Sequence, residues 1–375
     1  RFATWPKSVK NQKKTRPASG SPSASWPRPI FDANEFPMPS GYYGRMILVI
    51  GEALIDLIEN RYQPGSYNAI VGGANANVSI ALARRGTKQQ FLARISNDRF
   101  GKIIREKLEA NHVGLDHVVS TDELSTLVVV AIDSHGVPSY SFYVNGTADW
   151  GWTPDELPTD VDLENLHATA IQFGCLTMAM EPGNKVIEAW GKSHFEQNSV
   201  TISHDINMRP ALGFEPAKER ARVEYVNSFS HIIKASDEDI QWLYELDENA
   251  ADFQQRIDQI VADWIGNTGR HVFVTRGGDG VTVYRPGGTR LDVPSRRINV
   301  VDTVGAGDTF CANLLGQLSD VGALGTDAFD RLTNLSDDTI TEFVRVAGVA
   351  ASITCERAGA EPPTLADLNE VLATL

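Results

Sequence analysis

The chain has 375 residues, of which 42% are hydrophobic and 22% are charged. These values are typical of a globular protein with a substantial core, in one large domain or two. The formal net charge of −14 disfavours binding to nucleic acids and to anionic membranes, because both need a surface rich in Lys and Arg. No apolar run approaches the roughly 20 residues that span a bilayer.

The three cysteines are Cys175, Cys311 and Cys355, each among apolar or small residues. An odd number of widely spaced cysteines predicts neither a disulfide framework nor a zinc motif. We expect buried free thiols, which fit a reducing compartment such as the cytoplasm.

Residues 1–45 differ in composition from the rest of the chain. They hold eight Lys and Arg but two acids, and the stretch RPASGSPSASWPRPIF has neither a helical nor a strand period. This basic, Pro-rich composition predicts a disordered extension. A transit peptide is also basic, but prolines break the amphipathic helix that it needs. We expect the functional protein to begin near Met46.

From Met46 onward, strand-like runs alternate with helical patterns. The run ILVIGEALI (47–55) predicts a first strand, and GGANANVSIALARRG (72–86) predicts a helix ending at Gly86. A second helix is predicted over 98–114, where one face carries Phe100, Ile103, Ile104 and Leu108. Later strand-like runs are QFLARIS, TAIQFG, VTISHDI, HIIKAS and HVFVT. The alternation predicts an α/β fold with helices on both faces of a mostly parallel sheet, and a site at the carboxyl ends of its strands.

One region departs from this alternation. The run TLVVVAIDSHGVPSYSFYVNG (126–146) predicts two strands joined around His135-Gly136. Together, residues 57–71 and 126–147 predict a small antiparallel sheet that projects from the main layer. A sheet in that place suits a lid.

The run DTVGAGDT (302–309) precedes an apolar stripe that predicts a helix starting near Gly305. Gly305, Ala306 and Gly307 would let backbone N–H groups approach an anion, and the helix dipole adds positive charge. Such a turn suits a phosphoryl group in transfer, with Asp308 accepting the proton of the attacking hydroxyl. An acid in a first helical turn also has a simpler role, since it stabilises the helix by about 0.3–1 kcal/mol.

Two standard nucleotide motifs are absent from the sequence. Val186 stands where a Walker A loop before Gly191-Lys192-Ser193 needs its first Gly. In GAGDTF, Phe310 stands where a dinucleotide fingerprint needs a third small residue. A nicotinamide oxidoreductase is therefore disfavoured.

Together, GGANANVSIALARRG and DTVGAGDTFCANLL resemble the two signatures of the ribokinase-like, phosphofructokinase-B type sugar kinases, in the family's order. The resemblance runs from about Met46 to the C-terminus, and GEALIDLI, FYVNGTAD, DINMRP and TRGGDG bring it closest to the bacterial fructokinases. It implies one three-layer α/β/α domain over 46–375 with a small β-sheet lid. It also implies ATP with Mg²⁺ as the phosphoryl donor.

The resemblance implies roles for particular residues. Asp308 would be the catalytic base and Gly305, Ala306 and Gly307 the anion hole, with Arg209 stabilising the charge in transfer. The implied sugar ligands are Asp56, Gly72, Gly73, Asn77 and Asp308. Simpler roles remain open, as a solvated strand-end acid, a helix cap or a surface ion pair. Asn75 stands where many fructokinases have Pro, and we expect this change to loosen the turn.

On the nucleotide side, TRGGDG resembles a phosphate loop, although a plain hairpin turn before VTVY fits it as well. The implied ligands of the nucleotide are Ser236, Thr275, Gly277, Gly280, Gly305 and Gly307. Ser236-Asp237-Glu238-Asp239 replaces the family's Asn-x-x-Glu, so Asp239 is the candidate magnesium ligand, through water. The same four residues also suit a helix N-terminus. The family's potassium site, beside the anion-hole turn, is permitted by the sequence.

The resemblance thus predicts ATP-dependent phosphorylation of a small neutral sugar. A neutral acceptor is favoured over a phosphorylated sugar, because Arg209 is the main basic residue near the sugar motifs. The resemblance to the fructokinases favours D-fructose. Ribose, 2-keto-3-deoxygluconate, a nucleoside acceptor and a non-catalytic sugar sensor remain open, although a sensor does not need Asp308. Phe142 and Tyr143 of the lid would exclude water, and an exposed lid face would suit a homodimer contact.

Overall fold

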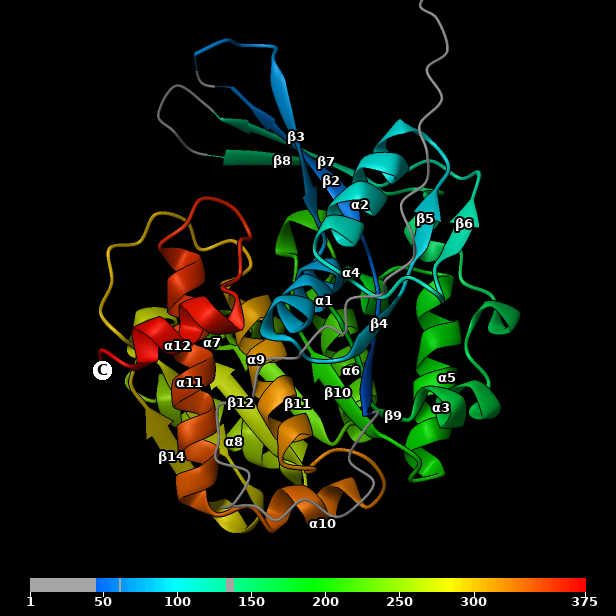
Figure 1. Cartoon of the computed structure of the whole chain (residues 1–375). Coiled ribbons are helices and arrows are strands. Elements are labelled where there is room, and N and C mark those ends of the chain that lie inside the picture. The colour runs from blue at the N-terminus through cyan, green and yellow to red at the C-terminus, as the bar shows by residue number, and fades with distance from the viewer. Residues whose placement is uncertain (1–44, 61, 133–137) are drawn as a thin grey trace, which may run out of the picture.

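The computed structural model describes residues 45–60, 62–132 and 138–375 (Figure 1). The predictions of a disordered N-terminal extension and of a turn at His135-Gly136 therefore fall outside the described residues, apart from Arg45.

An eight-stranded sheet forms the middle of the molecule, in the order β14-β13-β12-β11-β10-β9-β1-β4. From β4 to β12 neighbouring strands run parallel, and β13 and β14 add an antiparallel edge. The strands are β1 (Met46–Ile50), β4 (Gln89–Leu92), β9 (Ala168–Gly174), β10 (Thr201–Asp205), β11 (Ile232–Ser236), β12 (His271–Thr275), β13 (Val281–Tyr284) and β14 (Arg290–Val293). Most of their residues are buried, as expected for parallel strands covered on both faces.

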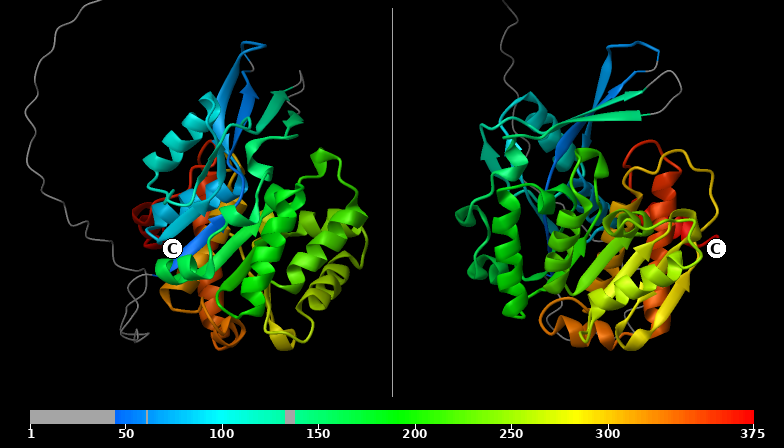
Figure 2. Two further views of the ribbon diagram at one scale, coloured as in Figure 1. Left: turned by 90° about the vertical axis from the view of Figure 1, so that its right-hand side faces the viewer. Right: turned by 180° about the vertical axis from the view of Figure 1, so that it is seen from behind.

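Helices cover both faces of this sheet (Figure 2). Alternate strand residues such as Ile47 and Phe273 pack with α1, α2, α9 and α11, whereas their neighbours Leu48 and Val272 pack with the helices of the other face. The helices are α1 (Ala74–Arg85), α2 (Arg99–Ala110), α3 (Asp160–Leu166), α4 (Cys175–Ala179), α5 (Gly183–Glu196), α6 (Pro216–Ser228), α7 (Asp237–Tyr244), α8 (Phe253–Ile265), α9 (Ala306–Asp320), α10 (Ala328–Thr333), α11 (Asp337–Cys355) and α12 (Leu365–Leu372). This arrangement confirms the predicted three-layer α/β/α fold.

A separate four-stranded sheet, β3-β2-β7-β8, projects beyond the carboxyl ends of the central strands (Figures 1 and 2). Its strands are β2 (Leu54–Glu59), β3 (Tyr67–Gly72), β7 (Leu127–Ile132) and β8 (Pro138–Tyr143). It is mixed rather than wholly antiparallel, because β2 and β7 run parallel. We call it the small sheet.

Two predicted strands are each broken in two. The run 47–55 divides at Gly51–Ala53, so that β1 lies in the central sheet and β2 begins the small sheet at Leu54, not at residue 57. The break follows from Glu52, whose buried carboxylate turns to bind the start of α1. The run 90–96 divides at Ala93 into β4 and β5 (Arg94–Ser96), and β5 pairs with β6 (Val119–Thr121).

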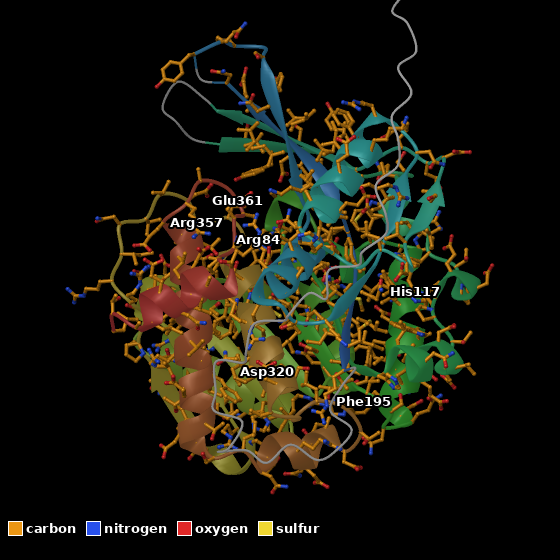
Figure 3. All side chains as sticks on the ribbon, in the orientation of Figure 1. Arg84, His117, Phe195, Asp320, Arg357 and Glu361 are labelled. Atoms are coloured by element: carbon orange, nitrogen blue, oxygen red, sulfur yellow. The ribbon has the colours of Figure 1, made fainter. Side chains whose placement is uncertain are left out.

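The segment after α11 is fastened to the helices on one face of the sheet. Arg84 of α1 and Lys107 of α2 both form ion pairs with Glu361, at 2.6 Å and 2.5 Å, and Arg357 pairs with Asp367 of α12 at 3.1 Å (Figure 3). These contacts hold the segment beside the start of α9.

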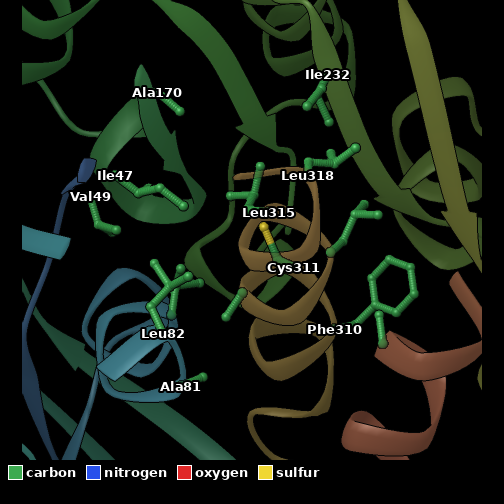
Figure 4. Close-up of a cluster of buried hydrophobic side chains, with 14 of the residues drawn as sticks. Ile47, Val49, Ala81, Leu82, Ala170, Ile232, Phe310, Cys311, Leu315 and Leu318 are labelled. Carbon is green, nitrogen blue, oxygen red and sulfur yellow. The ribbon is translucent and has the colours of Figure 1, made fainter. Parts of the chain in front are cut away.

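The helix predicted near Gly305 is α9, and its apolar stripe is confirmed. Phe310, Cys311, Leu315 and Leu318 are buried between α1, α11 and the sheet (Figure 4). The helix predicted to end at Gly86 also does so, with Gly86 in the left-handed conformation.

All three thiols are free, but only Cys175 and Cys311 are buried. Cys355 is half-buried because it is the last residue of α11, so the prediction of burial is wrong there. Among the described residues, none of the helices has the length and apolar character needed to cross a bilayer.

Candidate active site

The two signature segments meet at Asp308, in the first turn of α9. The side-chain amide of Asn77 donates to Oδ2 of Asp308 at 2.9 Å, and that of Asn207 donates to Oδ1 at 3.3 Å. Asp308 is 5% exposed. Burial raises its pKa, while the Asn77 amide and the charges of Lys234 and Arg209 oppose the rise. The result is a buried carboxylate with a raised proton affinity, held by side chains from two other segments.

The glycine turn before Asp308 is tightly packed. Gly305 caps α9 with φ 77°, and a Cβ there would lie 2.6 Å from the Cβ of Ala360 in the segment after α11. Ala306 and Gly307 open the helix, whose first N–H groups have no partners within the helix. A 15-residue helix therefore directs its positive end, with Gly305, Ala306 and Gly307, beside the Asp308 carboxylate.

A buried ion pair lies beneath this turn. Nζ of Lys234 on β11 lies 3.0 Å from Oδ1 of Asp205, the last residue of β10. A Cβ at Gly307 would lie 2.9 Å from the same Nζ. Although burial disfavours the ammonium charge, Asp205 and Asp239 raise the pKa of Lys234. Sequence reasoning missed Lys234, although a Lys inside the buried strand HIIKAS was a signal.

The sugar-side residues come from the small sheet and the start of α1. Asp56 lies inside β2 rather than at the end of the first strand. It faces Gly72 of β3 so closely that a Cβ there would lie 2.3 Å from Oδ2 of Asp56. Gly73 caps α1, which carries Asn77. Burial raises the pKa of Asp56 to about 6, and the charge of Arg209 opposes the rise.

Arg209 is oriented by its own segment. Its guanidinium donates to Oδ1 of Asn207 at 2.6 Å and to the carbonyl of Met208 at 2.8 Å. Strand β10 ends at Asp205, so strand alternation does not continue through this segment, but its side chains still converge. Asn207 connects Arg209 to Asp308.

The predicted nucleotide residues lie along the same edge of the sheet. Thr275 ends β12 opposite Ser236, which ends β11, and its hydroxyl donates to the carbonyl of Ala235 at 3.3 Å. Gly277 begins a short 3₁₀ turn, and Gly280 follows it before β13. Residues 275–280 thus form the connection of an antiparallel hairpin, which was the simpler of the two interpretations. Within this hairpin, Thr275 still lies at the carboxyl end of β12, beside Ser236 at the end of β11.

Both carboxylate oxygens of Asp239 accept hydrogen bonds from backbone N–H groups. Oδ2 accepts the N–H of Ser236 at 2.7 Å, Oδ1 accepts the N–H of Met208 at 2.7 Å, and the Ser236 hydroxyl accepts the N–H of Asp239. The predicted helix N-terminus is therefore present as a capping box. No group of three or more His, Cys, Asp or Glu side chains among the described residues has the arrangement of a metal site.

Sequence reasoning also missed Glu52, which is wholly buried. Its carboxylate accepts the N–H of Ala74 at 2.9 Å and the amide of Asn75 at 3.0 Å, and it accepts the hydroxyl of Thr177 as well. Asn75 also donates to the carbonyl of Gly174. The prediction that Asn75 loosens this turn is therefore wrong, because its amide joins the turn to two other segments. An acid inside the apolar run GEALIDLI was the available signal.

Several known proteins that resemble this chain are sugar kinases. The pfkB family carbohydrate kinase model matches residues 45–367. A fructokinase of Rhizobium leguminosarum bv. trifolii is 35% identical over 276 residues, which cover 73% of this chain and 79% of the relative. The probable fructokinase-4 of Arabidopsis thaliana is 29% identical over 87% of this chain and 96% of the relative.

Solved structures agree with these sequence comparisons. The structure of a fructokinase of Xylella fastidiosa with bound ATP is 26% identical and covers 88% of this chain and 98% of its own, with a TM-score of 0.76. A fructokinase of Vibrio cholerae O395, in its form with fructose, ADP and calcium ion, has the same identity and coverage with a TM-score of 0.70. The residues matched by the family model include the glycine turn and the buried Asp308. The chain belongs to the pfkB family of carbohydrate kinases.

Proposed function

We propose that this carbohydrate kinase transfers the γ-phosphoryl group of ATP to a hydroxyl of D-fructose. The observation that carries the proposal is the meeting of Asn77, Asn207 and Asp308 around one buried carboxylate at the positive end of α9. The fructokinase relatives, and the fructose and ADP bound to the Vibrio cholerae enzyme, support this choice of substrates.

In the proposed reaction, the carboxylate of Asp308 takes the proton of the sugar hydroxyl as that oxygen attacks the γ-phosphorus. A new P–O bond to the sugar forms while the bond to the ADP oxygen breaks. The N–H groups of Gly305, Ala306 and Gly307 stabilise the charge on the phosphoryl oxygens, and Arg209 adds a cation. Burial around Asp308 supports this role, since a raised pKa makes a carboxylate a better proton acceptor.

The acceptor would lie between the small sheet and α1. Asp56, Gly72, Gly73 and Asn77 would line its site, with the Asp56 carboxylate accepting bonds from two sugar hydroxyls. Arg209 already donates to Asn207 and Met208. This arrangement favours a neutral sugar over one that already carries a phosphate, which needs several converging cations.

The nucleotide would lie along the edge formed by Ser236, Thr275, Gly277 and Gly280, with its terminal phosphate at Gly305 and Gly307. Magnesium bound to the nucleotide supplies neutralisation of phosphate charge. Asp239 would contact it through water, since both carboxylate oxygens already accept a backbone N–H. A potassium ion is also proposed beside the turn at Gly305 and the segment after α11, which are neighbours at Ala360.

The small sheet is the proposed lid, corresponding to the predicted segments 57–71 and 126–147. Phe142 packs in an apolar cluster with Leu54, Trp150 and Cys175, on the side of the sheet that faces the site. Tyr143 is 60% exposed and points away, because neighbouring residues of a strand face opposite sides. Phe142 is therefore the proposed water-excluding aromatic, and Tyr143 is not.

We also propose a homodimer that forms through the small sheet, and a location in the cytoplasm. Exposed side chains on the face of that sheet turned away from the site support the first proposal: Tyr67 and Tyr143. The three free cysteines support the second. Light scattering that gives the mass of one chain would contradict the dimer.

The proposed function is tested by measuring ADP release from MgATP with a panel of acceptors. We expect fructose to give the highest kcat/KM, above ribose, 2-keto-3-deoxygluconate and adenosine. A higher value for another acceptor would overturn the choice of fructose but keep the chemistry. Tight sugar binding without ADP release from any acceptor would favour the sensor instead.

A further inference from the structure

The small sheet joins the rest of the molecule at four points. One is Gly73, which leads from β3 into α1, and the other three are linked to Asp149. Ala53 precedes β2, Thr126 precedes β7, and Val144 follows β8. Asp149 lies in a 3₁₀ turn, Ala148–Trp150, and is 1% exposed. It belongs to the segment FYVNGTAD, in which Phe142 has a proposed role in excluding water but Asp149 has none.

Hydrogen bonds connect Asp149 to each of these three points. The N–H of Ala53 donates to Oδ1 of Asp149 at 2.9 Å. Oδ2 of Asp149 lies 2.5 Å from the hydroxyl of Thr126, which lies 2.6 Å from the hydroxyl of Thr147. The Thr147 hydroxyl lies 3.0 Å from the carbonyl of Val144. One carboxyl group thus begins a chain of three short oxygen–oxygen contacts that ends where β8 ends.

Counting protons shows which form of Asp149 completes this chain. Three contacts between oxygen atoms need three protons, but the two threonine hydroxyls supply only two. If the carboxyl group is ionised, one contact has no proton, and buried oxygen lone pairs face each other. If Asp149 carries the third proton, it donates to Thr126, Thr126 donates to Thr147, and Thr147 donates to Val144. Every contact is then a hydrogen bond.

The surroundings of Asp149 agree with a neutral acid. Burial raises its pKa to about 7 and the charge of Glu52 adds to the rise, while the bonds that Thr126 and Ala53 would donate to the ionised form oppose it. Arg94 of β5 donates to the carbonyls on either side, at Ala148 and Gly151, and pairs with the acids Glu123 and Glu156 instead of the Asp149 carboxyl. Asp98, beyond the start of β7, binds Ser125.

We propose that Asp149 is a positioning residue whose protonated carboxyl group fastens the small sheet over the sugar site. The proposal rests on the proposed function, in which this sheet is the lid. Ala53 is held by Asp149, its neighbour Glu52 is held by α1 and α4, and Asp56 follows three residues later in β2. Fixing Ala53 therefore fixes the direction in which β2 presents Asp56 to the acceptor.

The proton count distinguishes two substitutions at this position. In Asp149→Asn, Oδ1 still accepts the N–H of Ala53 and the amide N–H₂ donates to Thr126, as the protonated acid does. We expect its KM for fructose to stay within about twofold of the original value. In Asp149→Ala, both bonds are lost, and we expect KM to rise about tenfold, with ATP hydrolysis that yields no phosphorylated sugar also rising. Thr126→Val, which removes the hydroxyl but keeps the shape, should resemble Asp149→Ala.

Two outcomes would overturn the proposal. If Asp149→Asn loses as much sugar affinity as Asp149→Ala, the group acts as a carboxylate anion. If Asp149→Ala keeps the original KM and the original ratio of hydrolysis to transfer, the residue does not position the sheet. A loss of kcat alone, with KM and this ratio unchanged, would also contradict a role in holding the lid.

A second measurement does not depend on activity. A folded-state pKa raised above the unfolded value means that the folded chain holds an extra proton between about pH 4 and pH 7, so stability from this group falls as pH rises through that window. Asp149→Asn lacks this term. Its melting temperature should therefore rise relative to the original protein between about pH 4 and pH 7. A difference in melting temperature that does not change with pH would refute the proton on Asp149. Because this measurement does not use fructose, it stays valid even if the proposed substrate is wrong.

Discussion

Asp308 and Asp239 are both the third residue of a helix at the carboxyl edge of the same sheet. Asp308 accepts side-chain amides from Asn77 and Asn207, which belong to other segments. Asp239 accepts backbone N–H groups from Ser236 and Met208. The side chains that hold the first acid leave the N–H groups of Gly305 and Gly307 to a ligand, although the N–H of Ala306 donates to the carbonyl of Thr303 at 3.2 Å. The second acid uses its oxygens to satisfy the backbone. An acid in a first helical turn is a candidate base when its partners are not the helix's own amides.

The largest expected effect is the loss of turnover in Asp308→Asn. The amide cannot accept the hydroxyl proton, and general base catalysis contributes about 10²–10⁴-fold, so kcat should fall about a thousandfold. The measurement is ADP release at saturating fructose and MgATP. Asp320→Asn, at the other end of α9, is the matched control and should keep its rate. If Asp308→Asn keeps more than a tenth of the original turnover, Asp308 is not the base, and its role does not differ from that of Asp239.

A third acid at this edge, Asp205, sharpens the comparison because its partner is a cation. Lys234→Met leaves the Asp205 carboxylate buried without its ion pair, and the free energy of unfolding should fall by about 3–5 kcal/mol. The measurement is equilibrium unfolding in urea. The double variant Lys234→Met with Asp205→Leu should recover most of the loss, since two apolar side chains replace the pair. If the single and double variants are equally unstable, the loss comes from packing and not from charge.

A smaller loss of stability is expected for Asp239→Ala. The substitution removes one half of the capping box of α7 and leaves the N–H groups of Ser236 and Met208 without their acceptors, so the free energy of unfolding should fall by about 2 kcal/mol. Asp367→Ala, in the exposed capping box of α12, is the control and should cost about 1 kcal/mol. The magnesium concentration that gives half the maximal rate distinguishes the two proposed roles of Asp239, which are contact with magnesium through water and hydrogen bonding to the backbone. If it does not change, Asp239 acts on the backbone alone.

The sequence predicted those features that depend on local pattern. Gly86 ends α1 and Gly305 begins α9 because a left-handed residue is needed at each position, and neighbouring letters reveal this. The order of strands and helices follows in the same way from hydrophobic periodicity. The resemblance of two segments to the family motifs also predicted Asp308 and Asn77 as residues of one site. The structure then shows their contact.

What the sequence could not predict depends on contacts between distant segments. Asn75 binds Gly174, 99 residues later, and Asp149 binds Ala53, 96 residues earlier. Neither partner can be read from the letters around Asn75 or Asp149. The division of ILVIGEALI into two strands has the same origin, because Glu52 is turned inward by bonds to Ala74 and Thr177. An acid or amide inside an apolar run indicates that such a contact exists without indicating its partner.

The smallest expected effect at neutral pH concerns the ionisation of the sugar-side acid. Burial raises the pKa of Asp56 to about 6 in the free protein, and Asp56 must be ionised to accept two sugar hydroxyls. The value of kcat/KM for fructose should therefore change little above about pH 7 and fall about tenfold per pH unit below about pH 6. The profile of kcat/KM against pH measures this directly. A profile that stays flat to about pH 5 would mean that Asp56 binds the sugar in its neutral form. It would also mean that the pKa of Asp308 does not lie in this range.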